Sequence, residues 1–262
     1  MKTLSRGEAE QMAFPSLTAG LKSRNAHPDF AKAFRAPSNP GSVCYRLSIM
    51  GAPPHNRWLE WSQRLQAIAQ NGLTFAHDSY DLERYRAVRQ IAAEMLAEGS
   101  GLGPTVILGL LGKENGYATP KVDVRGVVFR ESKLLLVREK SDGRWTLPGG
   151  WADVCESPAE NVVREIYEES GFLTRASKIL AVFDRSKHPH EPPFAFHVYK
   201  VFVLCTILGG KETPGSETDS VGFFSEAEIP ELSITRVTPG QIRRMFEHQR
   251  VPEMPTDFDH EA

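Results

Sequence analysis

The chain has 262 residues, of which 40% are hydrophobic and 24% are charged, and 31 basic against 33 acidic residues give a formal net charge of −2. This length accommodates one large domain or two small ones, and the apolar fraction excludes a wholly disordered protein. The charge balance argues against an obligate nucleic-acid partner, because binding to duplex phosphates needs a basic surface. Apolar runs are far shorter than the ~20 residues of a membrane span. Three scattered cysteines without CxxC spacing favour a reducing compartment, so we expect a cytoplasmic protein.

Residues 1–55 are predicted to form a poorly ordered leader. The first 49 residues contain seven basic and three acidic side chains, and no helical or alternating apolar pattern persists there. This segment lacks the continuous apolar core of a secretory signal, and its acidic residues weaken an interpretation as a transit peptide. We hypothesise that Met50 is the translation start, which mass spectrometry of the natively expressed N-terminus would decide.

Residues 56–116 are predicted to form a small helical domain. The first helix has an apolar stripe at helical spacing, interpreted as core packing: Trp58, Trp61, Leu65 and Ile68. Asn71-Gly72 is expected to end this helix, and a second helix is expected between Asp78–Asp81 and Gly99–Pro104, followed by the apolar stretch 106–111. Because so small a unit cannot bury much core alone, it should pack on the next domain or on a second subunit.

The spacing of apolar residues from 117 to 250 predicts several strands and two helices. Residues 122–128 alternate as in a buried strand, 131–133 read as a turn, and 134–137 as the returning strand. The later elements are expected at Pro158–Ser170 (helix), Lys178–Asp184, Phe196–Leu208 and Val221–Phe224 (strands), and Pro239–His248 (helix). This order predicts an α+β fold. The acidic tail, 251–262, is expected to be a frayed, solvated end.

The segment from Trp145 to Phe172 is the most informative. Leu147–Gly150 is a turn poor in side chains, which lets the backbone approach another group closely. Three carboxylates follow on one helix face at i, i+3 and i+4: Glu165, Glu168 and Glu169. Like charges at this spacing repel each other, and a donor set of oxygens alone favours Mg²⁺ or Mn²⁺ over zinc.

A longer spacing, G-x5-E-x7-R-E-U-x-E-E-x-G-U, surrounds these glutamates, where U is a bulky aliphatic or aromatic residue. Its fixed positions are Gly150, Glu156, Arg164, Glu165, Ile166, Glu168, Glu169, Gly171 and Phe172. A glutamate-rich helix alone is usually a solvated surface. The complete pattern, however, resembles the signature of the Nudix hydrolases.

This resemblance implies a role for each matching position. The metal-ligand and catalytic positions of the family correspond to Glu165, Glu168 and Glu169. The backbone carbonyl near Gly150 often adds a metal ligand, and Glu156 and Arg164 match the pair that supports the loop and orients the helix carboxylates. The implied cofactor is Mg²⁺, or Mn²⁺ in its place, because such ions neutralise diphosphate oxygens and activate water.

The general base is left open, because Nudix families use either a helix glutamate or an acid from a later loop. Glu217 lies just before the predicted strand Val221–Phe224 and resembles the late-loop acid. It is therefore a candidate catalytic residue or extra metal contact, and a solvated loop acid is the alternative.

Further candidates concern the substrate. Three arginines beside the signature are candidate phosphate contacts, with surface salt bridges as the alternative: Arg125, Arg138 and Arg144. Three aromatic residues could stack on a base, although aromatic residues near a turn more often close a core: Trp145, Trp151 and Phe194.

Motifs outside the signature extend the resemblance from about Arg57 to Gln249, among them Thr119–Arg125 and Trp145–Trp151. They resemble bacterial Nudix proteins with an N-terminal helical domain, a group that includes CDP-choline pyrophosphatases and proteins labelled ADP-ribose pyrophosphatases. The resemblance implies an α/β/α Nudix sandwich with a mixed sheet behind the small helical domain. It also implies a homodimer assembled partly through the N-terminal helices.

The leading hypothesis is Mg²⁺-dependent hydrolysis of a small nucleotide substrate, a nucleoside diphosphate linked to another moiety, of the ADP-ribose or CDP-choline type. The products would be a nucleoside monophosphate and a phosphorylated partner. One alternative is hydrolysis of nucleoside triphosphates or RNA 5′ ends, although the sequence lacks a long basic groove. Another is a ligand-sensing regulator on a Nudix scaffold, which the intact signature and the lack of a basic recognition helix disfavour.

Overall fold

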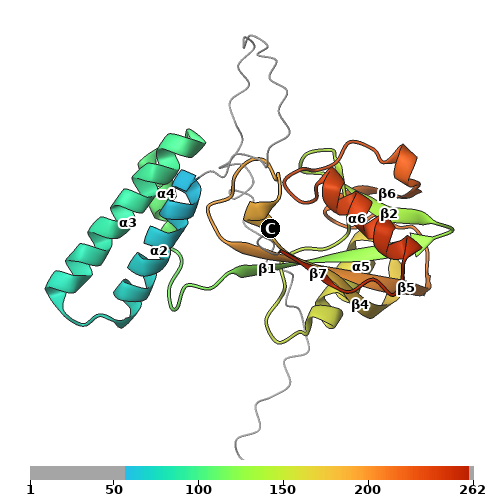
Figure 1. The fold of residues 1–262 in the computed structure, drawn as a ribbon, viewed down its shortest axis with the longest axis horizontal. Helices are drawn as coiled ribbons and strands as arrows, with labels where there is room; N and C mark the ends of the chain where they lie inside the picture. Colours follow the sequence, from blue (N-terminus) through green and yellow to red (C-terminus); the bar gives the residue numbers. More distant parts are fainter. Residues whose placement is uncertain (1–56, 260–262) are drawn as a thin grey trace, which may run out of the picture.

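The computed structural model describes residues 57–259, which form a helical domain beside a β-rich domain (Figure 1). The predicted leader and Met50 lie outside these residues. The helical domain consists of α2 (Arg57–Phe75), α3 (Ser79–Ser100) and α4 (Pro104–Leu111). None of the helices in the described part has the length and hydropathy needed to cross a bilayer.

The turn between α2 and α3 differs from the prediction. α2 continues through Gly72 to Phe75, because this glycine serves a close helix contact and not a helix stop. A Cβ atom at Gly72 would lie 2.3 Å from the ring of Tyr85 on α3. The start of α3 is confirmed, since the Asp78 side chain accepts hydrogen bonds from the first backbone N–H groups of the helix, and Gly101 ends it in the left-handed conformation.

Gly72→Ala is expected to destabilise the helical domain by about 1–3 kcal/mol, because the new methyl group would overlap the Tyr85 ring. Alanine is intrinsically the better helix former by about 1 kcal/mol, so the matched control is Gly109→Ala in α4, where a Cβ atom meets nothing within 4 Å. That control should be neutral or slightly stabilising. Urea unfolding monitored by circular dichroism measures both variants, and equal stability of the two would contradict the close contact.

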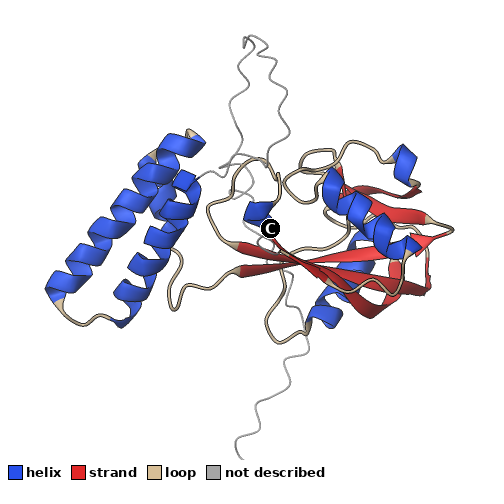
Figure 2. Cartoon of the chain, in the orientation of Figure 1, coloured by secondary structure: helices blue, strands red, loops and turns tan. Residues whose placement is uncertain are grey.

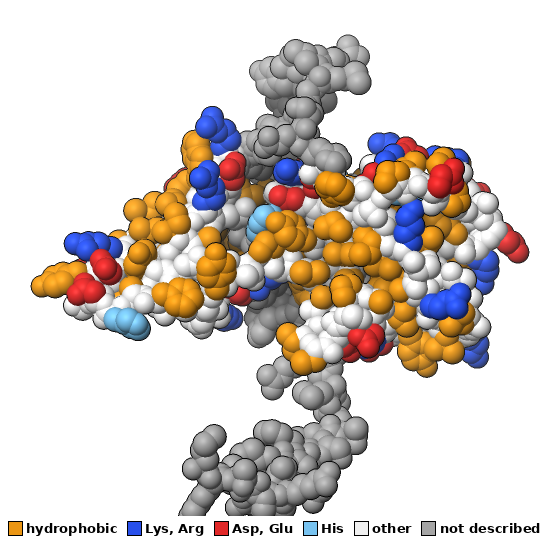
Figure 3. All heavy atoms as spheres, turned by 60° about the horizontal axis from the view of Figure 1, so that its bottom comes forward, with side chains coloured by type: hydrophobic (Ala, Val, Ile, Leu, Met, Phe, Trp, Pro, Cys, Tyr) orange, Lys and Arg blue, Asp and Glu red, His pale blue; other side chains and the backbone are white. Residues whose placement is uncertain are grey.

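The apolar stripe of α2 does not lie in the core along its whole length. The buried positions of α2 are Leu59, Ser62, Gln66, Ala69 and Gln70. Trp61 is 44% and Ile68 54% exposed, and Ile91 on α3 is 50% exposed. α2 and α3 both bury small alanine side chains, whereas these larger apolar side chains stay exposed. Figure 3 shows apolar side chains on the surface of this domain. The prediction of core packing is therefore wrong for Trp61 and Ile68.

The second domain is built around one mixed sheet of seven strands. They are β1 (Lys121–Arg130), β2 (Lys133–Glu139), β3 (Trp145–Thr146), β4 (Phe172–Asp184), β5 (Val198–Gly210), β6 (Thr218–Phe224) and β7 (Asp257–Phe258). Their order is β3-β2-β1-β5-β4-β7, with β6 also paired to β2; β1 and β5 run parallel, as do β4 and β7. The short 3-10 helices are η2 (Arg185–Lys187) and η3 (Glu226–Glu228).

Two helices cover this sheet on opposite faces, α5 (Pro158–Ser170) and α6 (Pro239–Arg250) (Figures 1 and 2). Val124 and Val128 of β1 pack in the cluster that contains Ile166 of α5, whereas Val127 packs in the cluster that contains Met245 of α6. This alternation follows from the two-residue period of a strand. The predicted α/β/α sandwich with a mixed sheet and a preceding helical domain is confirmed.

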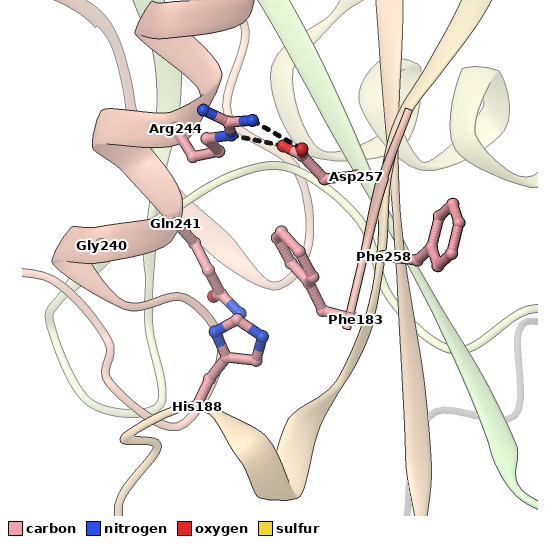
Figure 4. A pocket seen from close by; sticks show the side chains of 7 residues that line it. All are labelled: Phe183, His188, Gly240, Gln241, Arg244, Asp257 and Phe258. Atoms are coloured by element: carbon pink, nitrogen blue, oxygen red, sulfur yellow. Dashed lines mark hydrogen bonds and ion pairs between the residues drawn. The ribbon is translucent and has the colours of Figure 1, made fainter. Parts of the chain in front are cut away.

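The prediction of a frayed C-terminal end is wrong for residues 251–259, which pack on the domain, and the last three residues lie outside the described part. β7 pairs with β4, and the Asp257 carboxylate accepts hydrogen bonds from Arg244 of α6. Asp259 accepts a hydrogen bond from the Asp184 backbone N–H at 2.6 Å and lies 3.0 Å from His188 Nε2. Asp257 and Asp259 thus have hydrogen-bonding partners in the folded domain, which their acidic context in the sequence does not reveal. This segment borders a pocket of about 340 Å³. Figure 4 shows Asp257 and Phe258 among the side chains that line it.

Candidate active site

The turn before α5 is pressed against β1. The Val124 N–H donates to the Gly150 carbonyl and the Gly126 N–H to the Pro148 carbonyl, each at 2.8 Å. Gly149 has a φ of +138°, and a Cβ atom there would lie 2.0 Å from the Val124 carbonyl oxygen. Only glycine fits this backbone and this close approach.

The limits of α5 are fixed by local signals in the sequence. Ser157 caps the helix in a reciprocal capping box with Glu160, Pro158 occupies the first turn, and Gly171 ends the helix with a φ of +76°. The predicted range Pro158–Ser170 is confirmed. This helix orients the three signature glutamates.

Two of these glutamates point at the glycine turn. Glu169 accepts a hydrogen bond from the Gly149 N–H at 2.9 Å. Glu165 Oε2 lies 3.1 Å from the place that a Cβ atom on Gly150 would occupy. The Glu168 side chain is half exposed. The structure therefore brings Glu165 and Glu169 to the turn, whereas Glu168 contacts Arg164.

Arg164 connects the loop with the carboxylates. Its guanidinium lies 3.0 Å from Glu156, 2.9 Å from Glu165 and 3.2 Å from Glu168. It also donates to Asp153 at 2.9 Å, a partner that sequence reasoning missed because it falls on a variable position of the signature. The candidate support pair Glu156 and Arg164 is in direct contact.

The pKa values at the site reflect a negative charge that is poorly compensated. Burial raises the pKa of Glu169 well above its usual value, and the charge of Glu139 adds to this, while Arg125 and the Gly149 N–H oppose it. Burial also raises the pKa of Glu165, against the nearby Arg164. A bound cation would offset the unfavourable burial of these carboxylates.

Glu139 on β2 is an acid that sequence reasoning missed. It is buried, its Oε1 lies 3.0 Å from Nε of Arg236, and burial raises its pKa. The only signal in the sequence was a charge at the end of an apolar run. Glu217 is exposed and, through its charge, is among the groups that raise the pKa of Glu139. The charges of Glu217 and Glu139 thus interact. The catalytic role of Glu217 stays a prediction.

The three candidate arginines lie in different surroundings. Arg125 is 4% exposed, and its guanidinium donates to both oxygens of Asp123 and to the Leu147 carbonyl. It therefore lies beneath the surface, and the predicted phosphate contact is not available to it in this structure. Arg138 and Arg144 are half exposed in ion pairs with Asp219 and Glu231, and their contact with substrate stays a prediction.

A buried ion cluster surrounds Arg125. Asp123 accepts a hydrogen bond from Lys200 Nζ at 2.6 Å as well, and Lys200 is only 2% exposed. Burial lowers the pKa of Lys200 to about 7, although Asp123 opposes this. Sequence reasoning missed the cluster, because the pairing of β1 with β5 brings together residues that are far apart in the chain.

A preformed metal site is not part of this arrangement. Between Arg57 and Asp259, no three His, Cys, Asp or Glu side chains are grouped closely enough to hold an ion. In this structure the guanidinium of Arg164 contacts both Glu165 and Glu168. The donor set still fits Mg²⁺, because it consists of carboxylate oxygens next to a backbone carbonyl.

Comparison with known proteins agrees with this geometry. The family model described as "UDP-X-like, N-terminal oligomerisation domain" matches residues 56–111, and the NUDIX domain matches residues 119–246. A Bacillus subtilis (strain 168) protein named "Putative ADP-ribose pyrophosphatase YjhB" is 50% identical over 203 residues, which are 78% of this chain and 97% of the relative. An ADP-ribose pyrophosphatase of Methanocaldococcus jannaschii is 31% identical over 120 residues, 45% of this chain and 69% of the relative.

A crystal structure of a UDP-X diphosphatase is 33% identical and has a TM-score of 0.50, with 78% of this chain and 99% of that chain covered. It therefore matches the helical domain as well as the catalytic fold. With the complete signature assembled around the glycine turn, the chain belongs to the Nudix hydrolase family and is a Nudix pyrophosphohydrolase.

Proposed function

We propose that this protein hydrolyses the pyrophosphate bond of a nucleoside diphosphate linked to another moiety, and that it requires Mg²⁺. The observation that carries the proposal is the pair of carboxylates directed at the Gly149-Gly150 turn: Glu169, which is buried and has no ion-pair partner among the described residues, and Glu165, which is partly buried. A divalent cation is the partner that such oxygens bind and that diphosphate hydrolysis needs.

The residues have separate roles in this proposal. Glu165, Glu168 and Glu169 would hold the cation, together with the Gly150 carbonyl, whose second lone pair remains after the hydrogen bond from Val124. A bound Mg²⁺ would supply positive charge to the diphosphate oxygens and make the attacking water more acidic. The helix glutamates and Glu217 are the candidates for the carboxylate that would accept the proton of this water.

Arg164 and its partners keep these carboxylates in position. Its guanidinium contacts Glu156 and Asp153 on the loop side and Glu165 and Glu168 on the helix side. Since one planar group reaches all four acids, the loop and helix are held in a single arrangement. Positioning of this kind affects catalysis without contact to the substrate.

For the substrate, an ADP-ribose type is favoured by the names of the Bacillus and Methanocaldococcus relatives, and a UDP-linked type by the UDP-X diphosphatase. CDP-choline remains a candidate from the sequence motifs alone. We further propose that residues 117–250 carry out the reaction in the cytoplasm and that residues 56–116 assemble a homodimer. The match to an oligomerisation domain and the exposed Trp61, Ile68 and Ile91 support this assembly.

The test is a substrate panel with Mg²⁺ or with EDTA: ADP-ribose, UDP-glucose, CDP-choline, NADH and nucleoside triphosphates. Products are separated by chromatography. We expect Mg²⁺-dependent release of a nucleoside monophosphate from at least one nucleoside diphosphate-linked substrate, and no turnover in EDTA. Turnover of nucleoside triphosphates alone, or activity that survives EDTA, would contradict the proposal.

A further inference from the structure

A pair of aromatic side chains lies next to the glycine turn and has no role in the proposed chemistry. Trp151 directly follows Gly150, and its ring stacks on Phe194 from the segment between η2 and β5, with ring centroids 6.1 Å apart and an interplanar angle of 26°. Both residues are partly exposed. Trp145, in contrast, packs edge-on against Phe224 at 4.7 Å on the hydrophobic core.

The strand pairing shows which side of the turn this pair occupies. Trp151 forms an antiparallel bridge with Asp123 of β1, so both side chains lie on the same face of the sheet. Arg125, two residues further along β1, lies on that face too, and a Cβ atom on Gly149 would lie 3.0 Å from its Cα atom. Glu169 comes from α5 on the other face of the sheet and reaches this segment at the Gly149 N–H. The aromatic pair, the buried ion cluster and the Glu169 carboxylate therefore follow one another along the segment beside β1.

The spacing along this line suits a nucleotide. At full extension two residues span about 7 Å, which is the upper limit for the separation between the Cα atoms of Trp151 and of Gly149, whose N–H donates to Glu169. This separation is comparable to the ribose between a base and its phosphates. A diphosphate at the carboxylates would thus leave the nucleobase at the aromatic pair.

The charges around the rings favour a neutral, planar ligand over a cationic one. The Arg185 guanidinium lies 5.3 Å from the centre of the Phe194 ring, and Lys121 Nζ lies 5.0 Å from that of Phe196, which packs edge-on against Phe194. The Arg185 cation would repel a quaternary ammonium group such as that of choline, whereas Glu114, 3.0 Å from Lys121 Nζ, compensates the charge of Lys121. A base can stack on an aromatic face regardless of its identity.

The segment that carries Phe194 contacts the helical domain. Gln63 of α2 donates a hydrogen bond to the Phe194 carbonyl at 3.0 Å. The neighbouring Ala195 is buried in the core cluster of α2, α3 and α4. The position of Phe194 relative to Trp151 therefore depends on contacts from both domains.

We propose that Trp151 and Phe194 form the platform that binds the nucleobase of the substrate. This inference rests on the proposed function, which it deepens by assigning the two ends of the substrate. The base lies at Trp151, and the second moiety lies on the opposite side of the carboxylates.

The test compares binding of nucleoside monophosphates with binding of ribose 5-phosphate, which lacks the base. The full chain is titrated by calorimetry with AMP, UMP, CMP and GMP in Mg²⁺, as wild type and as Trp151→Leu and Phe194→Leu. Tyr117→Leu is the matched control, because Tyr117 is 68% exposed and lies in the connection between α4 and β1. Circular dichroism and thermal unfolding establish that each variant is folded.

We expect the wild type and Tyr117→Leu to bind at least one nucleoside monophosphate about tenfold or more tightly than ribose 5-phosphate. Trp151→Leu should abolish this preference and Phe194→Leu should reduce it. No preference in the wild type, or a full preference in folded Trp151→Leu, would overturn the inference. Because binding needs no turnover, base-dependent binding without hydrolysis would refute the proposed function and leave the platform standing.

Discussion

Glu169→Gln is expected to lower kcat for the nucleoside diphosphate substrate by about 10³-fold while the protein stays folded. Glutamine keeps the size of the side chain and can still accept the hydrogen bond from the Gly149 N–H. It removes the negative charge that the cation requires. Steady-state kinetics over a range of Mg²⁺ concentrations measures the effect.

The matched control is Glu160→Gln on the same helix. Glu160 belongs to the capping box, where glutamine is an accepted replacement, and it lies outside the carboxylate face. This variant should turn over substrate like the wild type. Comparable kcat values for Glu169→Gln and Glu160→Gln would refute the assigned role of Glu169.

The same Glu169→Gln variant should be more stable than the wild type in EDTA at neutral pH. Because burial raises the pKa of Glu169 in the folded state, its ionisation disfavours folding at high pH, and this penalty disappears as the pH falls below the unfolded value of 4.5. The gain in Tm, about 2–4 °C for each kcal/mol, should therefore be present at pH 8 and absent near pH 4. Thermal unfolding at both pH values checks it, and a lower Tm at pH 8 would contradict the unfavourable burial.

Arg164→Met is expected to lower kcat/KM by about 10- to 100-fold. The substitution keeps much of the aliphatic stem but leaves Glu165 without its only ion-pair partner among the described residues and frees the loop acids Glu156 and Asp153. Arg164→Lys should rescue little, because a single ammonium group cannot reproduce the fork that contacts four carboxylates. The exposed Arg175→Met serves as the control for removal of one positive charge.

A double-mutant cycle separates positioning from a general loss of charge. If Arg164 acts through the loop, Arg164→Met combined with Glu156→Gln should cost less activity than the sum of the two single changes. Strictly additive effects, or full activity of Arg164→Lys, would show that the contacts between loop and helix do not position the carboxylates.

The active-site helix could be predicted from the sequence because its signals are local. Ser157, Pro158 and Gly171 set the limits of α5, and the i, i+3, i+4 spacing alone places three carboxylates on one face. The orientation of that face toward the glycine turn followed from the resemblance to the Nudix signature and not from periodicity.

The remaining features depend on contacts between distant parts of the chain. Arg125 looks like an accessible strand residue in the sequence, but Asp123 and Lys200 bury it once β5 pairs with β1. In the sequence Gly72 resembles a helix stop, because the residue that it contacts, Tyr85, lies on another helix. In the same way, the order of the tail depends on partners such as Arg244 that local composition does not reveal.

Calorimetric titration with Mg²⁺, in the presence of a non-hydrolysable methylene analogue of the diphosphate substrate, tests the central claim most directly. We expect the wild type to bind the ion, with binding strongly weakened in Glu169→Gln and unchanged in Glu160→Gln. Equal Mg²⁺ affinity in all three proteins, or no uptake of the ion by the wild type, would contradict the assignment of the α5 carboxylates as the metal site.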